Sequence, residues 1–192
     1  MSKSNPVDQI FEVFPLTPQR WQDFETLFGP NGGCAGCWCT WWLITNKEFS
    51  STTSAERKET LRTLVQQGKE PGLIAYLNGI PAGWVAVAPR TDYLRLNNSK
   101  KFAEVDDQPV WLISCFFINR KYRKQGLMEK LTAAACEFAR SKGANLIEAF
   151  PKRAVAKASP LSIYTGVDSV FLRQGFVVVA EREDRPIMRK ML

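Results

Sequence analysis

VWLISCFFINRKYRKQGLMEKLTAAACEFARSKG, residues 110–143, runs from an apolar stretch through a basic one into an amphipathic one. Residues 110–118 are almost continuously apolar, which is typical of a strand buried on both faces of a sheet. Residues 119–125 are basic, and apolar side chains then recur at helical spacing from Gly126 until Gly143, a common helix end. The sequence therefore predicts a central strand, a cationic turn and a helix.

The predicted turn has the donors that a phosphate group needs. The first N–H groups of a helix lack partners inside the helix, and they point outward at the positive end of its dipole. Gly126 lets a phosphate come close to the backbone. Four cationic side chains surround the same turn: Arg120, Lys121, Arg123 and Lys124. These features predict a pyrophosphate-binding turn, although an ordinary loop with a solvated basic face would share them.

The segments on either side predict one mixed α/β domain that spans residues 1–192. Asn78-Gly79 lies between two apolar runs and predicts a β-hairpin, because both residues tolerate positive φ. Thr53 and Glu56 have the spacing of a capping box at a helix start. The elements predicted outside 110–143 are strands at 10–14, 73–77, 81–88, 145–150, 176–180 and 187–191, and helices at 18–28, at 53–67 and ending near Gly175.

The composition limits the classes of function. Apolar residues make up 45% of the 192 residues and charged residues 23%, which is normal for a globular domain. No apolar run approaches the roughly 20 residues of a membrane helix, and residues 1–9 lack the apolar core of a signal peptide. We therefore expect a cytoplasmic protein that binds no membrane. The net charge of +7 favours an anionic partner, and the absence of His removes the commonest general base.

The strand, turn and helix resemble the acyl-coenzyme A signature of the GNAT N-acetyltransferase superfamily, in which Arg/Gln-x-x-Gly-x-Gly/Ala follows a strand. Arg123 and Gly126 match this signature, and Tyr122 with Arg123 matches a Tyr-Arg pair common in that loop. Met128 departs from it, since Gly or Ala is usual there, and its side chain must point away from the cofactor. The hairpin, the strand at 145–150 and Gly175-Phe176 also fall where the superfamily has them, so the resemblance covers about residues 10–192.

The resemblance implies an α/β fold with a single mixed, mostly antiparallel central sheet, a splayed parallel strand pair and flanking helices. It also implies acetyl-CoA as co-substrate and an amine as acceptor, with no metal. The acyl thioester would end near Ser114, Cys115 and Phe116, where the amine attacks it directly. The residues implied to hold the cofactor are Phe117, Ile118, Arg123, Lys124, Gln125, Gly126, Leu127 and Met128.

The catalytic groups do not follow from the resemblance. Many members place a Tyr four residues before the Gly of the final Gly-Phe, where it protonates the departing thiolate, but this chain has Phe171 there. Tyr164 is a substitute candidate, with a packing role as the alternative. Cys115 is a candidate acyl-accepting nucleophile, although a buried Cys is usually a small apolar core residue.

Cysteine and tryptophan cluster in residues 34–42. Cys34-x-x-Cys37-x-Cys39 has the close spacing of metal ligands, but zinc would need a fourth ligand and there is no His. The Cys-Trp-Cys-x-Trp-Trp run resembles one in a poorly characterised bacterial subgroup of the superfamily. Trp38 and Trp41 would then line an acceptor pocket, where aromatic faces bind a protonated amine. The alternative is a packed turn.

Three functions thus follow from the sequence, and an N-acetyltransferase is the first. The second is a non-catalytic acyl-CoA-binding regulatory domain, which Phe171 favours. The third is a zinc- or nucleic-acid-binding module, but the basic residues are spread over several segments without a recognition motif, so we expect no nucleic acid. The acceptor, either a small molecule or a protein amino group, and a homodimer both stay open.

Overall fold

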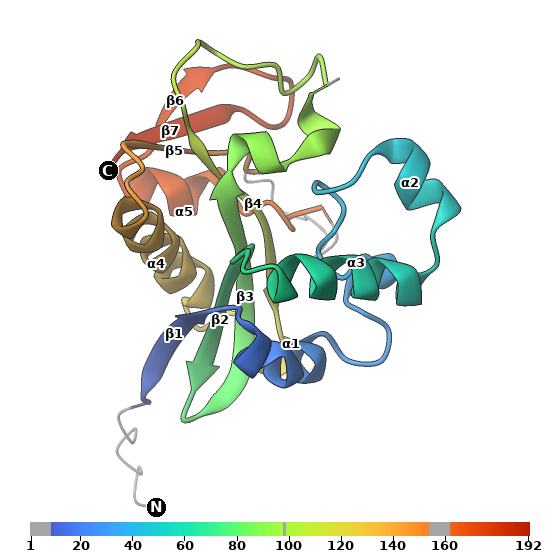
Figure 1. Cartoon of the computed structure of the whole chain (residues 1–192). Coiled ribbons are helices and arrows are strands. Elements are labelled where there is room, and N and C mark those ends of the chain that lie inside the picture. Colours follow the sequence, from blue (N-terminus) through green and yellow to red (C-terminus); the bar gives the residue numbers. More distant parts are fainter. Residues whose placement is uncertain (1–8, 98, 154–161) are drawn as a thin grey trace, which may run out of the picture.

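A seven-stranded sheet forms the centre of the computed structural model, which describes residues 9–97, 99–153 and 162–192 (Figure 1). The strand order is β1-β2-β3-β4-β5-β7-β6. Only β4 and β5 pair in parallel among the described strands, which confirms the predicted mixed, mostly antiparallel sheet. The strands are β1 (Phe11–Pro15), β2 (Gly72–Leu77), β3 (Ile80–Pro89), β4 (Trp111–Ile118), β5 (Leu146–Ala149), β6 (Val177–Ala180) and β7 (Ile187–Met191).

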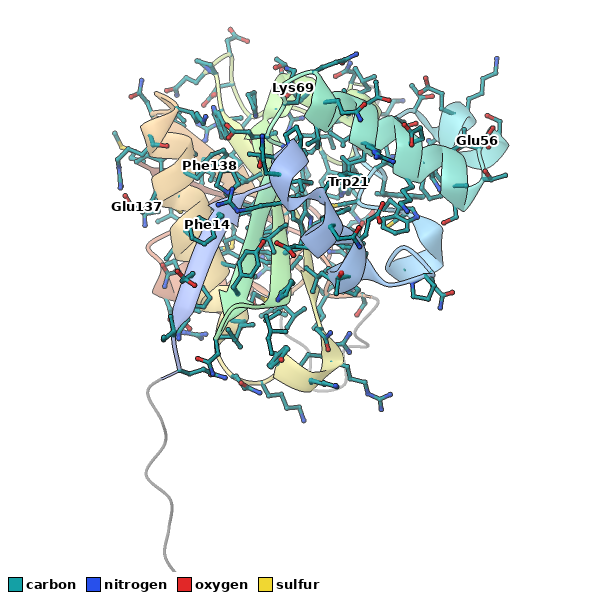
Figure 2. The ribbon with its side chains drawn as sticks, turned by 60° about the horizontal axis from the view of Figure 1, so that its bottom comes forward. Phe14, Trp21, Glu56, Lys69, Glu137 and Phe138 are labelled. Carbon is teal, nitrogen blue, oxygen red and sulfur yellow. The ribbon has the colours of Figure 1, made fainter. Side chains whose placement is uncertain are left out.

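Helices cover both faces of this sheet (Figures 1 and 2). They are α1 (Trp21–Phe28), α2 (Asn46–Ser51), α3 (Ser54–Gln66), α4 (Leu127–Ser141) and α5 (Asp168–Arg173). Helices α4 and α5 lie on one face, whereas α1 and α3 lie on the other. Figure 2 shows Phe138 of α4 and Trp21 of α1 on opposite sides of the strands. No helix in the described ranges is long and apolar enough to span a membrane.

Local sequence signals account for several element boundaries. Asn78 and Gly79 have φ angles of 52° and 75°, so the predicted hairpin turn between β2 and β3 is confirmed. At the start of α3, Thr53 Oγ1 accepts from the Glu56 N–H and the Glu56 carboxylate accepts from the Thr53 N–H, which confirms the capping box. Helix α2 was not predicted, because its Asn and Ser residues favour turns as readily as helices.

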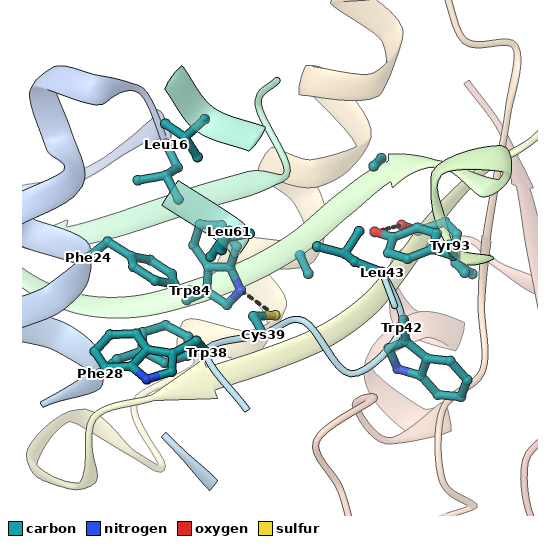
Figure 3. Close-up of a cluster of buried hydrophobic side chains, with 14 of the residues drawn as sticks. Leu16, Phe24, Phe28, Trp38, Cys39, Trp42, Leu43, Leu61, Trp84 and Tyr93 are labelled. Carbon is teal, nitrogen blue, oxygen red and sulfur yellow. Dashed lines mark hydrogen bonds between the residues drawn. The ribbon is translucent and has the colours of Figure 1, made fainter. Parts of the chain in front are cut away.

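Two apolar clusters fill the space between the sheet and the helices. On the α1 face, Trp84 is completely buried, and its Nε1 donates to Cys39 Sγ at 3.1 Å (Figure 3). Phe24 and Phe28 pack edge-on against the Trp84 ring. On the other face, Leu131 of α4 packs into a second cluster with residues of β3, β4 and β5. Strand β4 therefore contributes to both clusters, as its apolar sequence predicts.

Strands β4 and β5 separate soon after they pair. Strand β4 pairs with β3 at both ends, from Trp111 to Ile113 and from Cys115 to Ile118, but with β5 only from Trp111 to Ile113, opposite residues 147–149. A register shift between Ala86 and Val87 of β3 leaves Ser114 unpaired, so β4 carries a bulge where the separation begins. Bulges bend a strand and end regular pairing. The predicted splayed parallel pair is thus present, and beyond Ser114 one edge of β4 has no neighbouring strand among the described residues.

The capping box gives a prediction for stability. Thr53→Ala removes an N-cap acceptor and should lower the free energy of unfolding by about 1 kcal/mol. Thr60 lies inside the same helix and its hydroxyl only bonds the Glu56 carbonyl, so Thr60→Ala should change stability by less than about 0.5 kcal/mol. Urea denaturation of both variants measures the difference. Equal stabilities of the two variants would contradict the role of the cap.

Candidate functional site

The loop before α4 presents unpaired backbone donors. A short 3-10 turn, Arg120–Tyr122, follows β4, and the chain then adopts positive φ at Lys124 (61°) and Gly126 (75°) before α4 begins. Within the described part of the chain, the N–H groups of residues 125–128 have no hydrogen-bond acceptor. The loop therefore combines four free N–H groups with the positive end of a 15-residue helix, which is the arrangement that binds phosphate.

Cationic side chains surround these donors. The four predicted side chains, Arg120, Lys121, Arg123 and Lys124, are exposed, and none pairs with a carboxylate in the described ranges. Met128 packs against the second apolar cluster, so the side chain that departs from the resemblance turns toward the core. The predicted loop residues are therefore brought together around one helix end.

The free edge of β4 bonds to groups of the chain itself. The Phe116 N–H donates to the Tyr164 carbonyl at 2.6 Å, and the Ile118 carbonyl accepts from Arg123 Nε at 3.1 Å. Phe117 points to the α1 face, where its ring stacks on Phe28 at 4.7 Å. An extended ligand that paired with this edge would have to replace both bonds, since buried main-chain groups need partners.

Tyr164 and Phe171 lie on different sides of this edge. Phe171 is completely buried, with its ring edge-on to Phe116 and Phe176, so no proton donor stands at its position. Tyr164 is half-buried, and burial raises the pKa of its phenol. The Arg185 guanidinium lies 5.3 Å from the centre of the Tyr164 ring. The Tyr164 phenol therefore keeps its proton at neutral pH. The main-chain carbonyl of the same residue is hydrogen-bonded to β4.

The thiols of Cys37 and Cys115 are half-buried and protonated. Contact with the Cys39 thiol, together with burial, raises the pKa of Cys115 well above its ordinary range. Burial raises the pKa of Cys37 to about 12, whereas Cys34 is exposed. Nucleophiles and metal ligands are thiolates, so these surroundings disfavour both roles. In the ranges that the structure describes, no three His, Cys, Asp or Glu side chains are placed to hold a metal ion.

The two tryptophans considered for the acceptor already face cations of the chain. Trp38 is 4% exposed, stacks on Phe28 and donates from Nε1 to Ser54 Oγ at 3.0 Å, and the Lys58 ammonium lies 5.1 Å from its ring centre. Trp41 is 38% exposed, and the Arg95 guanidinium lies 3.8 Å from its ring centre. A protonated amine would therefore compete with a resident cation at either ring.

A buried ionic cluster, for which no local sequence pattern exists, lies beside the separated strands. Glu148 of β5 is 2% exposed, and burial raises the pKa of its carboxyl. Arg189 donates to Glu148 at 2.7 Å, and Arg90 lies 4.0 Å from the second carboxylate oxygen. Arg90 and Arg189 are 58 and 41 residues away in the chain, so only the folded sheet brings the three side chains together. The cluster holds the ends of β3, β5 and β7 together.

Two surface hollows lie away from the loop at 120–128. One, of about 600 Å³, is lined by Glu25, Trp38 and Lys58 among others, between α1 and α3. The other, of about 560 Å³, is lined by Arg90, Leu96 and residues up to Glu104. Neither includes a residue of that loop. Where β4 and β5 separate, the Phe116 N–H of β4 instead bonds the Tyr164 carbonyl.

Comparisons with known proteins agree with this architecture. The sequence model of the acetyltransferase (GNAT) family matches residues 38–159, more than half of the chain. No curated protein sequence matches this chain. The PaiA N-acetyltransferase of Thermoplasma acidophilum, solved with coenzyme A, superposes with a TM-score of 0.54 at 14% identity over 95% of this chain and 99% of its own.

Two further solved structures share the fold. A GNAT-family acetyltransferase of Listeria monocytogenes has a TM-score of 0.54 at 14% identity over 96% of this chain and 100% of its own. An uncharacterised protein of Bacillus halodurans has a TM-score of 0.57 at 16% identity over 96% of this chain and 86% of its own. The family match, the seven-stranded sheet and the separated β4–β5 pair lead to one conclusion: this chain belongs to the GNAT acetyltransferase family.

Proposed function

We propose that the protein transfers an acetyl group from acetyl-CoA to an amine, which attacks the thioester directly. The observation that carries this proposal is the position of the free N–H groups at 125–128 directly beyond the open edge of β4. If the cofactor's pyrophosphate bound these N–H groups, its thioester could reach the edge of β4. The PaiA relative, whose structure contains coenzyme A, supports the same cofactor.

The loop would hold the cofactor mainly by electrostatics. Backbone N–H groups of residues 125–128 would donate to the pyrophosphate oxygens, and Arg123 and Lys124 would supply positive charge. Arg123 would leave the Ile118 carbonyl, and the Tyr164 carbonyl would leave the Phe116 N–H. Both backbone groups would then pair with the amide-bearing arm of acetyl-CoA near Phe117 and Ile118.

Tyr164 is the proton donor that we propose. When the neutral amine attacks, a carbon–nitrogen bond forms and the carbon–sulfur bond breaks. The departing thiolate takes the phenol proton that Phe171 cannot supply, and the proton released from the attacking nitrogen restores the phenol. The Tyr164 phenol has a raised pKa, so it keeps its proton through neutral pH. In the free protein its carbonyl is bonded to the Phe116 N–H, so the residue lies at the level of β4 before the cofactor replaces that bond. The bonds from Arg185 to the Ser162 carbonyl and to Thr165 Oγ1 would then hold the segment around Tyr164. Cys115 has no part in this scheme because its thiol stays protonated.

A non-catalytic acyl-CoA-binding domain is the second candidate. Phe171 favours it, since a phenyl ring fills the place of the usual donor. Such a domain would bind acetyl-CoA with the same loop but would acetylate no amine. Binding and turnover must therefore be measured separately.

Acetyl-CoA binding is the first test. A saturating concentration, about 100 times the dissociation constant, should stabilise the protein by about 2.7 kcal/mol, which thermal unfolding detects. Arg123→Ala should weaken binding about tenfold through loss of a charge-assisted contact. Arg62→Ala is the matched control, because Arg62 is an exposed arginine on α3. No stabilisation of the wild-type protein would refute the cofactor assignment.

Turnover with an amine panel, followed by chromatography of coenzyme A and the acetylated product, is the second test. Tyr164→Phe should lower kcat about 100-fold and leave the KM for acetyl-CoA nearly unchanged, because it removes only proton donation. Tyr76→Phe is the control, since the Tyr76 hydroxyl bonds Asp23 on the α1 face. An unchanged kcat in Tyr164→Phe would exclude Tyr164 as donor. Binding without any turnover would favour the regulatory domain.

A further inference from the structure

Arg185 lies beside Tyr164 at the open edge of β4. Its Nη2 donates to the Ser162 carbonyl at 2.7 Å, and its Nη1 donates to Thr165 Oγ1. The guanidinium carries five N–H donors, so these two bonds use fewer than half of them. Arg185 thus both fastens the segment around Tyr164 and keeps donors for a ligand.

Arg95 is the second cation that acts on Tyr164. Its guanidinium covers Trp41, and it donates to the carbonyls of Trp41 and Thr45 and to Asn46 Oδ1. All of these acceptors are neutral. Arg95 and Tyr164 interact electrostatically, and Arg185 acts on Tyr164 in the same way. The Tyr164 phenol is therefore within electrostatic reach of both guanidinium groups, and that of Arg185 lies 5.3 Å from its ring centre.

The nearby carboxylates are already paired with other cations. Asp184 pairs with Lys101 and Lys152, and Glu183 pairs with Lys101. Glu181 pairs with Arg153. Among the residues that the structure describes, neither Arg95 nor Arg185 has a carboxylate partner within 4 Å. Both side chains are half-buried, and a half-buried charge without a carboxylate partner is costly.

We propose that the amine acceptor also carries an anionic group, a carboxylate or a phosphate, which Arg185 and Arg95 bind beside Tyr164. The proposal rests on the proposed function, because it names the acceptor class of that same site. An anion would receive charge-assisted hydrogen bonds from the unused guanidinium donors. The same positive surroundings disfavour an ammonium ion, so the bound acceptor is held as the neutral amine that attacks.

This assignment explains why the aromatic rings would not select a cationic acceptor. Lys58 lies over Trp38 and Arg95 lies over Trp41, so each ring already has a cation. Discrimination between acceptors then depends on charge rather than on aromatic surface. An acceptor that lacks the anion would leave both guanidinium groups uncompensated.

Matched pairs of amines test the acceptor class in the wild-type protein. β-Alanine is compared with β-alaninamide for the carboxylate, and phosphoethanolamine with ethanolamine for the phosphate. Rates are corrected for the fraction of neutral amine. We expect kcat/KM to be at least about tenfold higher for the anionic member of one pair, as for one charge-assisted contact. The pair that shows the larger ratio identifies the anion.

Variants of Arg185 and Arg95 then show whether these two side chains cause the preference for the anionic amine. Arg185→Gln and Arg95→Gln keep hydrogen-bond donors but remove the charge, so each should reduce the anionic-to-neutral ratio about tenfold. Arg185→Lys keeps the charge, so it should retain most of the anionic-to-neutral ratio of kcat/KM. Arg182→Gln is the control within the same loop, because Arg182 bonds only the Glu181 carbonyl. Thermal unfolding shows whether each variant is folded.

The outcomes separate this inference from the proposed function. If acetyl-CoA stabilises the protein but no anionic amine reacts faster than its neutral partner, the acceptor assignment is overturned and the cofactor site stands. A ratio that stays constant in folded Arg185→Gln and Arg95→Gln also overturns it. If acetyl-CoA does not bind, the proposed function fails first, and the acceptor assignment fails with it.

Discussion

The incomplete pairing of β4 with β5 determines what this molecule can bind. Strand β4 has a full antiparallel partner in β3, but only three of its eight residues pair with β5. The bulge at Ser114 marks the start of the separation. Beyond it, main-chain groups of a central strand face a neighbour that is not a strand. Because such groups need partners, the chain supplies them from Tyr164 and Arg123, the two residues that the proposed cofactor would displace.

Much of the fold could be predicted from local sequence. The apolar run, basic turn and amphipathic helix of residues 110–143 correspond to β4, the loop and α4, and Asn78-Gly79 forms its hairpin turn. These signals depend on residues close together in the chain. Helix α2 does not follow from residue propensity, because its Asn and Ser residues favour turns as readily as helices, and its one local signal is the Thr45–Glu48 capping box.

The candidate site could be predicted only in part, for the same reason. The loop at 123–128 is contiguous, so its donors and cations are visible in the sequence. Tyr164 and Phe116 are bonded across 48 positions of chain, and Arg95 reaches Trp41 across 54. No local pattern encodes such contacts. The position of Arg185 beside Tyr164 and the buried ionic cluster at Glu148 therefore became visible only in the folded structure.

The exchange rates of backbone amides, measured with and without acetyl-CoA, test most directly whether the edge of β4 and the loop before α4 hold the cofactor. The amides of residues 125–128 have no acceptor among the described residues, so they should exchange quickly in the free protein. Bound acetyl-CoA should slow exchange in the peptides that cover residues 116–128. Unchanged exchange there, with protection confined to the hollow between α1 and α3, would contradict the account.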